Sequence, residues 1–163
     1  MKKKSVAIKR VVLSLLTLFL IAYIFINSSF DADASDTQSL GVTAMLNDIL
    51  HSLNINIILS NHFVRKSAHF TEYFVLGVLL FYTAKAYFSK IDYKIIVAPI
   101  SGLVVACVDE TIQLFATGRS GQITDVLLDF SGICTAVLIL YVISKMRKFK
   151  KDEEVLNGSD KIT

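Results

Sequence analysis

Long apolar runs alternate with short polar segments along the chain, and this pattern predicts its secondary structure. The segments predicted to be helical on this basis are residues 6–26, 61–87, 95–115 and 123–143. Each is close to the roughly 17–25 residues that an α-helix needs to cross a bilayer. Pro99 falls near the start of the third segment, where a helix tolerates proline. The pattern therefore predicts an all-α integral membrane bundle of four transmembrane helices, formed by residues 1–163 as a single domain.

A further helix is predicted in the segment between the first two spans, residues 27–60. From residue 42 to residue 53 the apolar side chains recur with the i, i+3, i+4, i+7 spacing of an amphipathic helix. Its other face is too polar for a spanning helix, so we expect this external helix to lie along the outer membrane surface. Residues 27–39, which precede it, are polar and acidic and are expected to form a loop.

The first apolar run has an alternative interpretation as a secretory signal. Ala32, Asp33 and Ala34 have the small-x-small pattern of a cleavage site. The run is long for a signal, and the pattern lies well beyond its end, which favours an uncleaved first helix. Both interpretations place the following segment outside the cell.

Lysine and arginine residues are divided unevenly between the two ends of the predicted spans. All but three of the 17 lie in the N-terminal tail, in the loop at residues 85–94 or in the tail at residues 144–163. The exceptions are Arg65, Lys66 and Arg119. Because Lys and Arg concentrate in cytoplasmic loops, this predicts a multi-pass protein of the bacterial cytoplasmic membrane with both termini in the cytoplasm. The end of the C-terminal tail, residues 157–160, is expected to be disordered.

The composition agrees with a membrane protein. The chain is 53% hydrophobic and only 19% charged, whereas a soluble domain of this length carries more charge. A net charge of +3 is too small to indicate a nucleic-acid partner, so membrane lipids are the expected partners. Cys107 and Cys134 both fall in predicted spans, which favours buried thiols over a disulfide. Nothing in the sequence indicates a cofactor or an oligomeric state.

Ionisable and other polar residues gather at the outer ends of three predicted spans, where a buried charge costs free energy unless it is compensated. They come from the start of the second span, the end of the third, and the turn and start of the fourth: Arg65, His69, Glu72 and Tyr73; Asp109, Glu110 and Gln113; Arg119, Asp125 and Asp129. The predicted topology brings the three groups to one level of the bilayer. Gly132 lies on the same helical face as Asp125 and Asp129, and it would let another helix approach that face closely.

Three interpretations of this cluster stay open on the residues alone. The first is a pocket for a polar headgroup, in which His69 and a carboxylate act as acid and base and Arg119 holds an anionic group. The second is a structural network, in which Arg119 and His69 hold the three helices together. The third is a bound metal, because one histidine among many carboxylates suits a hard or borderline cation. No closely spaced ligand motif is present, so no metal ligand is assigned.

For a working pocket, each cluster residue receives a candidate role. The candidate catalytic residues are His69, Glu72, Asp109, Glu110 and Asp125, and the candidate ligand-binding residues are Arg65, Tyr73, Gln113, Arg119 and Asp129. We expect Arg119 to compensate the carboxylates, since its planar fork can bridge two of them. Phosphate-binding loops and the common hydrolase motifs are absent from the sequence, which leaves open whether the protein is an enzyme.

Two signatures in these segments resemble the VanZ-like membrane protein family. The first is RKSAHFTEY at residues 65–73, followed by Leu76-Gly77. The second is DExxQ at residues 109–113, followed by GRSG at residues 118–121, Asp125-Val126 and Asp129-x-x-Gly132. Family members often carry proline before the Gly-Arg pair, where this chain has Thr117. The resemblance covers roughly residues 65–139.

The family takes its name from a protein linked to low-level resistance to teicoplanin and related lipoglycopeptides. The resemblance therefore implies the same role here. The resemblance does not settle the biochemical activity. Our first hypothesis is that the pocket binds or modifies a cell-wall precursor, another cell-envelope lipid or a surface component and so lowers antibiotic access; the alternative is a non-catalytic membrane scaffold whose polar network is structural.

Overall fold

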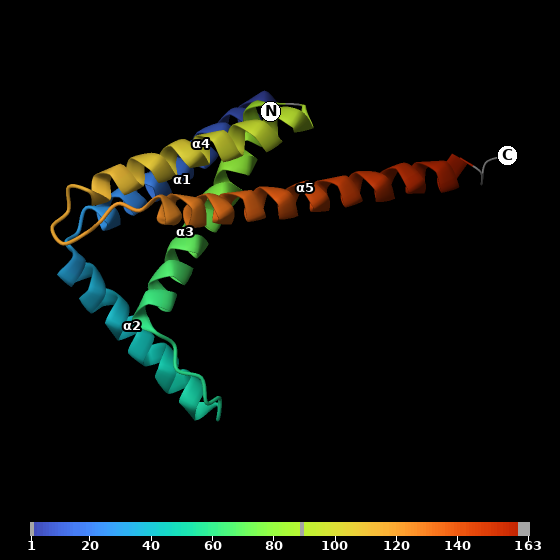
Figure 1. Ribbon diagram of the computed structural model, residues 1–163. Helices are drawn as coiled ribbons and strands as arrows, with labels where there is room; N and C mark the ends of the chain where they lie inside the picture. The colour runs from blue at the N-terminus through green and yellow to red at the C-terminus, as the bar shows by residue number, and fades with distance from the viewer. Residues whose placement is uncertain (1, 89, 160–163) are drawn as a thin grey trace.

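The computed structural model describes residues 2–88 and 90–159, and all regular structure in these residues is helical. In chain order the helices are α1 (Lys2–Ser28), α2 (Ala32–Ser52), α3 (Asn61–Tyr87), α4 (Ile91–Gln113) and α5 (Ile123–Ser159) (Figure 1). The predicted all-α fold class is therefore confirmed.

Helix α3 is the centre of the fold, because it contacts each of the other four helices. Helices α1 and α4 pack against each other on one side of it (Figure 1). Helix α5 crosses α3 and then continues well beyond the other helices (Figure 1). Helix α2 lies near the N-terminal end of α3 and points away from α1 and α4 (Figure 1). The buried apolar core lies between α1, α3, α4 and α5, around Tyr73, Leu76 and Ile133, which are all fully buried.

Glycines allow α3 and α5 to cross at close range. A Cβ atom on Gly132 would lie 2.6 Å from the backbone oxygen of Phe70, and one on Gly77 would lie 2.9 Å from the Cα atom of Ile133. Real Cβ atoms do not approach backbone so closely, so neither position accepts a larger residue without separating the helices. The prediction that Gly132 permits a close helix approach is confirmed.

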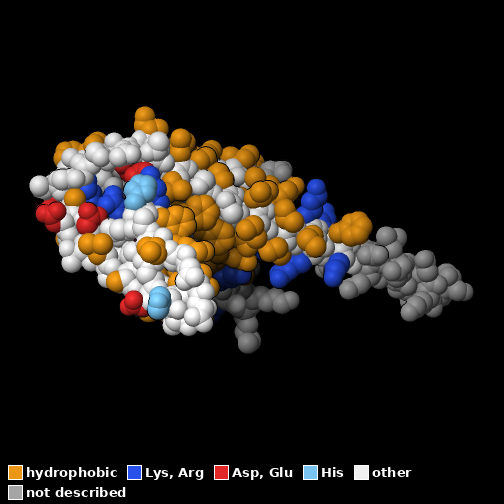
Figure 2. Space-filling model, turned by 60° about the horizontal axis from the view of Figure 1, so that its bottom comes forward, with side chains coloured by type: hydrophobic (Ala, Val, Ile, Leu, Met, Phe, Trp, Pro, Cys, Tyr) orange, Lys and Arg blue, Asp and Glu red, His pale blue; other side chains and the backbone are white. Residues whose placement is uncertain are grey.

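Three of the four predicted spans are long and apolar enough to cross a membrane. They are the segments Lys4–Ser28, Tyr93–Gln113 and Ile123–Lys150, with mean hydropathies of 2.3, 1.9 and 2.3. Helix α3 has the predicted bounds but is not among these three segments. Hydrophobic side chains form a broad exposed band across the body, and basic side chains follow this band where α5 leaves it (Figure 2).

Helix α2 begins earlier than predicted. Residues 32–39 are helical instead of forming a loop, because Asp33 in the first turn interacts favourably with the helix dipole and Asp36 forms an ion pair of 2.9 Å with Arg65 of α3. The predicted helix at residues 42–53 is confirmed, with Leu53 as its C-cap. Its apolar side chains, such as Met45, are exposed.

The last two helices are longer than predicted. Helix α4 begins at Ile91, so Pro99 lies in its interior and not in its first turns. Helix α5 continues through residues 144–159, including most of the tail end expected to be disordered; residue 160 lies outside the described residues. Residues 144–159 contain four Lys, two Glu and no proline, a composition that sustains a helix beyond the apolar run.

Gly132→Ala should destabilise the fold, because the added methyl group meets backbone of α3 and cannot be accommodated by a side-chain rotation. We expect a loss of about 1–3 kcal/mol, measured by thermal unfolding of the purified protein in detergent. Gly41→Ala is the matched control, since a Cβ atom there meets nothing within 4 Å. An unchanged melting temperature for Gly132→Ala would contradict the close crossing.

Candidate functional site

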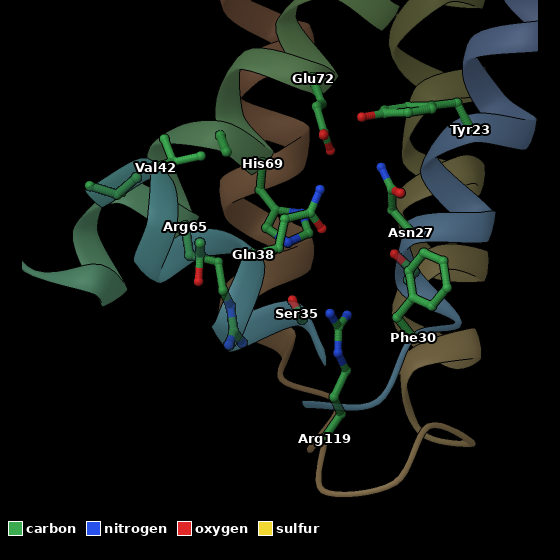
Figure 3. Close-up of a pocket in the computed structure, with 14 residues that line it drawn as sticks. Tyr23, Asn27, Phe30, Ser35, Gln38, Val42, Arg65, His69, Glu72 and Arg119 are labelled. Atoms are coloured by element: carbon green, nitrogen blue, oxygen red, sulfur yellow. The ribbon is translucent and has the colours of Figure 1, made fainter. Parts of the chain in front are cut away.

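A cavity of about 160 Å³ opens between α1, α2, α3 and the loop that joins α4 to α5. Its polar lining consists of Tyr23, Asn27, Ser28, Ser35, Gln38, Ser39, Arg65, His69, Glu72 and Arg119. Tyr23 and Asn27 extend from α1 toward the side of the cavity that carries Glu72, and Arg119 enters from the loop (Figure 3). Four separate segments of the chain thus supply polar groups to one space.

The two arginines of this cavity differ in their partners. Arg65 pairs with Asp36 at 2.9 Å. Arg119 forms no ion pair within 4.0 Å in the described part of the chain, and its buried Nε atom has no hydrogen-bond partner there. Burial lowers the pKa of the Arg119 guanidinium from its usual value, and the neighbouring charge of Arg65 lowers it further, yet arginine stays protonated in proteins. The direct carboxylate pairing expected for Arg119 is not formed, so its charge is available to the cavity.

A second, smaller cavity of about 90 Å³ lies between α3 and α5. Arg65 and His69 line both cavities. In the second one, Lys66 donates to Asp125 over 2.6 Å, which ties the start of α3 to the start of α5. Asp129 also lines this space, one helical turn beyond Asp125.

Beneath the cavities lies a group of buried polar side chains on α4 and α5. Asp109 and Asp129 are 0% and 1% exposed, and Gln113 is 5% exposed. Gln113 donates to Asp109 over 3.4 Å, and Glu110 accepts from the backbone amide of Gln122. These two bonds leave most of the carboxylate oxygens unused.

Several buried atoms in this region have no hydrogen-bond partner among the residues that the structure describes. They are His69 Nδ1, Tyr73 Oη, Asp109 Oδ1, Glu110 Oε2 and both carboxylate oxygens of Asp129. Burial of polar atoms without hydrogen-bond partners costs free energy, so we expect these atoms to bind water, an ion or another ligand.

The structure distributes the ten residues singled out in the sequence over three adjoining places. Arg65, Glu72 and Arg119 line the larger cavity, and Gln113, Asp125 and Asp129 line the smaller one. Tyr73, Asp109 and Glu110 line neither cavity, and His69 lines both.

Sequence reasoning missed the cavity wall formed by α1 and α2. Tyr23 and Asn27 lie one turn apart at the end of an apolar run, and Ser35 and Gln38 are three residues apart on α2. The i, i+3 and i, i+4 spacing of polar residues beside an apolar run was the available signal.

An apolar groove of about 480 Å³ adjoins the polar cavity. Its lining comes mostly from α1, α2 and α3 and includes Leu20, Leu46, Phe63 and Val75. The groove and the cavity share Val42, Val64, Ala68 and Glu72, so they form one continuous amphipathic space.

The family model described as VanZ/LLP1 matches residues 13–144. The chain belongs to the VanZ/LLP1 family. The match confirms the resemblance seen in the two signatures, and together with the apolar helices it indicates a membrane protein. Comparisons with curated proteins and with solved structures gave no match.

Two hydrogen bonds join the start of α2 to the loop between α4 and α5 of this VanZ/LLP1 chain, and we call this pair of bonds the clip. Both segments lie within the residues that match the family model. Asp31 Oδ1 accepts from the backbone amide of Thr117 over 2.9 Å, and the amide of Ala32 donates to the Thr117 oxygen over 3.0 Å. Gly118 follows with a φ of 74°, a conformation that favours glycine. The clip fixes the loop from which Arg119 enters the cavity.

Asp31→Ala should loosen this loop, because the Thr117 amide loses its carboxylate acceptor. We expect hydrogen exchange at the Thr117 amide to speed up by about tenfold, which corresponds to a lost hydrogen bond of about 1.4 kcal/mol. Asp33→Ala is the control, since Asp33 is exposed and takes no part in the clip. Equal exchange in both variants would show that the clip does not hold the loop.

Proposed function

We propose that this VanZ/LLP1 protein binds the anionic headgroup of a cell-envelope lipid in the larger cavity and thereby lowers susceptibility to teicoplanin and related lipoglycopeptides. The observation that carries the proposal is the continuity of a cationic, polar cavity with an apolar groove. A lipid has the same two parts, a charged headgroup and a hydrocarbon chain. Its retention by the protein would reduce antibiotic access to the envelope.

The headgroup end of the space suits a phosphate or carboxylate. Arg119 presents a guanidinium that has no ion-pair partner in the residues described, and such a planar fork binds an anion with two parallel hydrogen bonds. Tyr23, Asn27 and Gln38 add neutral donors and acceptors to the wall. His69 and Glu72 line the same cavity and would be the acid and base if the bound headgroup is also modified.

The other end of the space suits a hydrocarbon chain. The groove beside α3 is lined mainly by side chains such as Leu46, Phe63 and Val75. Concave sites with an apolar wall and a few directed polar groups are the usual form of a small-molecule site. A lipid with its headgroup at Arg119 and its hydrocarbon chain along Phe63 would occupy the cavity and the groove together.

The proposal includes an arrangement of four spanning helices with the cavity toward the cell exterior. Helix α3, with 27 residues, is about 40 Å long at 1.5 Å per residue, which exceeds the thickness of the hydrocarbon core. Its charged groups lie toward the cavities and ion pairs described above, which reduces their cost in a bilayer. The basic residues at the opposite ends of the helices support an orientation with both termini in the cytoplasm of a bacterium.

Thiol labelling tests this orientation. In a background with Cys107→Ala and Cys134→Ala, we expect Thr37→Cys to react with a membrane-impermeant reagent in intact cells and Lys90→Cys to react only after lysis. Both positions are exposed, so accessibility to the solvent is matched. Labelling of Lys90→Cys alone in intact cells would reverse the orientation and refute an outward cavity.

Arg119→Gln tests the binding site. Loss of the charge-assisted hydrogen bonds, worth about 1.5–3 kcal/mol, should weaken lipid retention by roughly 10- to 100-fold. Retention is measured as anionic lipid that co-purifies with the protein, and teicoplanin susceptibility is measured in the same strains at matched membrane levels. Arg147→Gln, on the exposed end of α5, is the control.

The outcomes separate the proposal from a purely structural role of the polar network. Normal membrane levels with less bound lipid and greater susceptibility support the proposal. Unchanged lipid and unchanged susceptibility in Arg119→Gln would refute it. Reduced protein levels that are restored by Arg119→Lys, with no change in lipid bound per protein, would indicate a scaffold instead.

A further inference from the structure

We infer that His69, Asp109 and Asp129 form a binding site for a divalent first-row metal cation of hard or borderline character, such as Mn²⁺ or Zn²⁺. The three residues come from α3, α4 and α5 and meet beneath the two cavities. One ligand atom from each lies within 4.8 Å of the other two. The site shares His69 with the border of the lipid cavity proposed above, but its argument does not depend on that proposal.

The strongest reason for a cation is the burial of the two carboxylates. Asp109 is 0% exposed and Asp129 is 1% exposed. Among the residues described, Asp109 Oδ1 and both carboxylate oxygens of Asp129 have no hydrogen-bond partner. Buried carboxylates of this kind are normally paired or coordinate a metal.

The nearby basic side chains do not compensate these carboxylates. Lys66 is paired with Asp125 at 2.6 Å and Arg65 with Asp36 at 2.9 Å. Within the described ranges, no Lys or Arg lies within 4.0 Å of a carboxylate oxygen of Asp109 or Asp129. Among the described residues, the only ionisable nitrogen within 4.0 Å of these two carboxylates is His69 Nδ1, which lies 4.0 Å from Asp129 Oδ1.

The ligand atoms of the three residues lie slightly farther apart than they would around a bound metal ion. Zinc bonds to histidine and carboxylate are about 2.0–2.2 Å long, so ligand atoms around one ion are roughly 3–4 Å apart. Small rotations of the His69 and Asp129 side chains would shorten their 4.0 Å separation. His69 Nδ1 is itself buried without a hydrogen-bond partner in the described structure, so it is available as a ligand.

The donor set selects the class of ion. Two carboxylates and one imidazole suit zinc, manganese or ferrous iron, whereas the absence of sulfur among the three ligands disfavours Cu⁺. Three protein ligands leave a coordination position for water or another oxygen donor. His69 borders both cavities, which provides a route for the ion and for a further ligand.

Calorimetry on the full chain tests the site. The protein is purified in detergent with a tag that lacks histidine, stripped with chelator and titrated with Zn²⁺. We expect one saturable site per chain, weakened at least about tenfold in His69→Gln and in Asp129→Asn. His51→Gln and Asp48→Asn are the matched controls, because both residues are exposed on α2 and border none of the three spaces described above.

A variant that gains an absorption band on metal binding separates loss of the metal site from failure to fold. In His69→Cys loaded with Co²⁺, a thiolate-to-metal charge-transfer band should appear that is absent from the parent chain, which already contains Cys107 and Cys134. The band requires residue 69 to touch the ion. Absence of saturable Zn²⁺ binding, full binding by Asp129→Asn, or no new Co²⁺ band in a folded His69→Cys protein would each overturn the inference. None of these measurements depends on lipid retention or antibiotic susceptibility.

Discussion

The close crossing of α3 and α5 is the constraint on which the rest of the structure depends. Gly77 and Gly132 present no side chain where the helices meet, so backbone packs against backbone. This contact sets how far α5 enters the bundle and places Asp129, three residues before Gly132, beside His69 of α3. Helix α4 packs against both helices and adds Asp109 to the same buried place.

The consequence of this packing is a group of buried carboxyl side chains, Asp109, Glu110 and Asp129, that have no Lys or Arg within 4.0 Å among the described residues. Arg65 and Lys66 are engaged by Asp36 and Asp125 at the periphery. Arg119 enters the larger cavity from a loop held by the Asp31 clip. The cavity proposed for an anionic headgroup and the carboxylates proposed to bind a metal therefore lie next to each other, and His69 is common to both.

The helices with a strong local signal were predictable. Helix α3 has the predicted bounds because the Ser60 hydroxyl caps its first turn, accepting a hydrogen bond from the Phe63 amide, and a capping serine before an apolar run is visible in the sequence. The early start of α2 was not visible in this way. It accompanies an ion pair between Asp36 and Arg65, which lie 29 positions apart and meet only after folding.

The candidate residues of α3, α4 and α5 were predictable because charges within apolar runs are rare and cluster at sites. Their division into two cavities and a buried group depended on side-chain packing and could not be read from spacing. The contribution of α1 was missed for a different reason. The only signal on α1 was the i, i+4 spacing of Tyr23 and Asn27 at the end of an apolar run, and neither side chain carries a charge that would mark a site.

The central claim is that the buried carboxylates are kept for what they bind and not for the stability of the fold. The most direct measurement is the thermal unfolding of Asp109→Asn/Asp129→Asn in metal-free detergent buffer, with Asp125→Asn as control. These two buried carboxyl groups have no Lys or Arg within 4.0 Å among the described residues. Their replacement should raise the melting temperature, because sites of this kind carry a cost in stability, whereas Asp125→Asn breaks its ion pair with Lys66 and should not raise it. A lower melting temperature for the double variant would contradict the account, because it would show that the carboxylates hold the helices together.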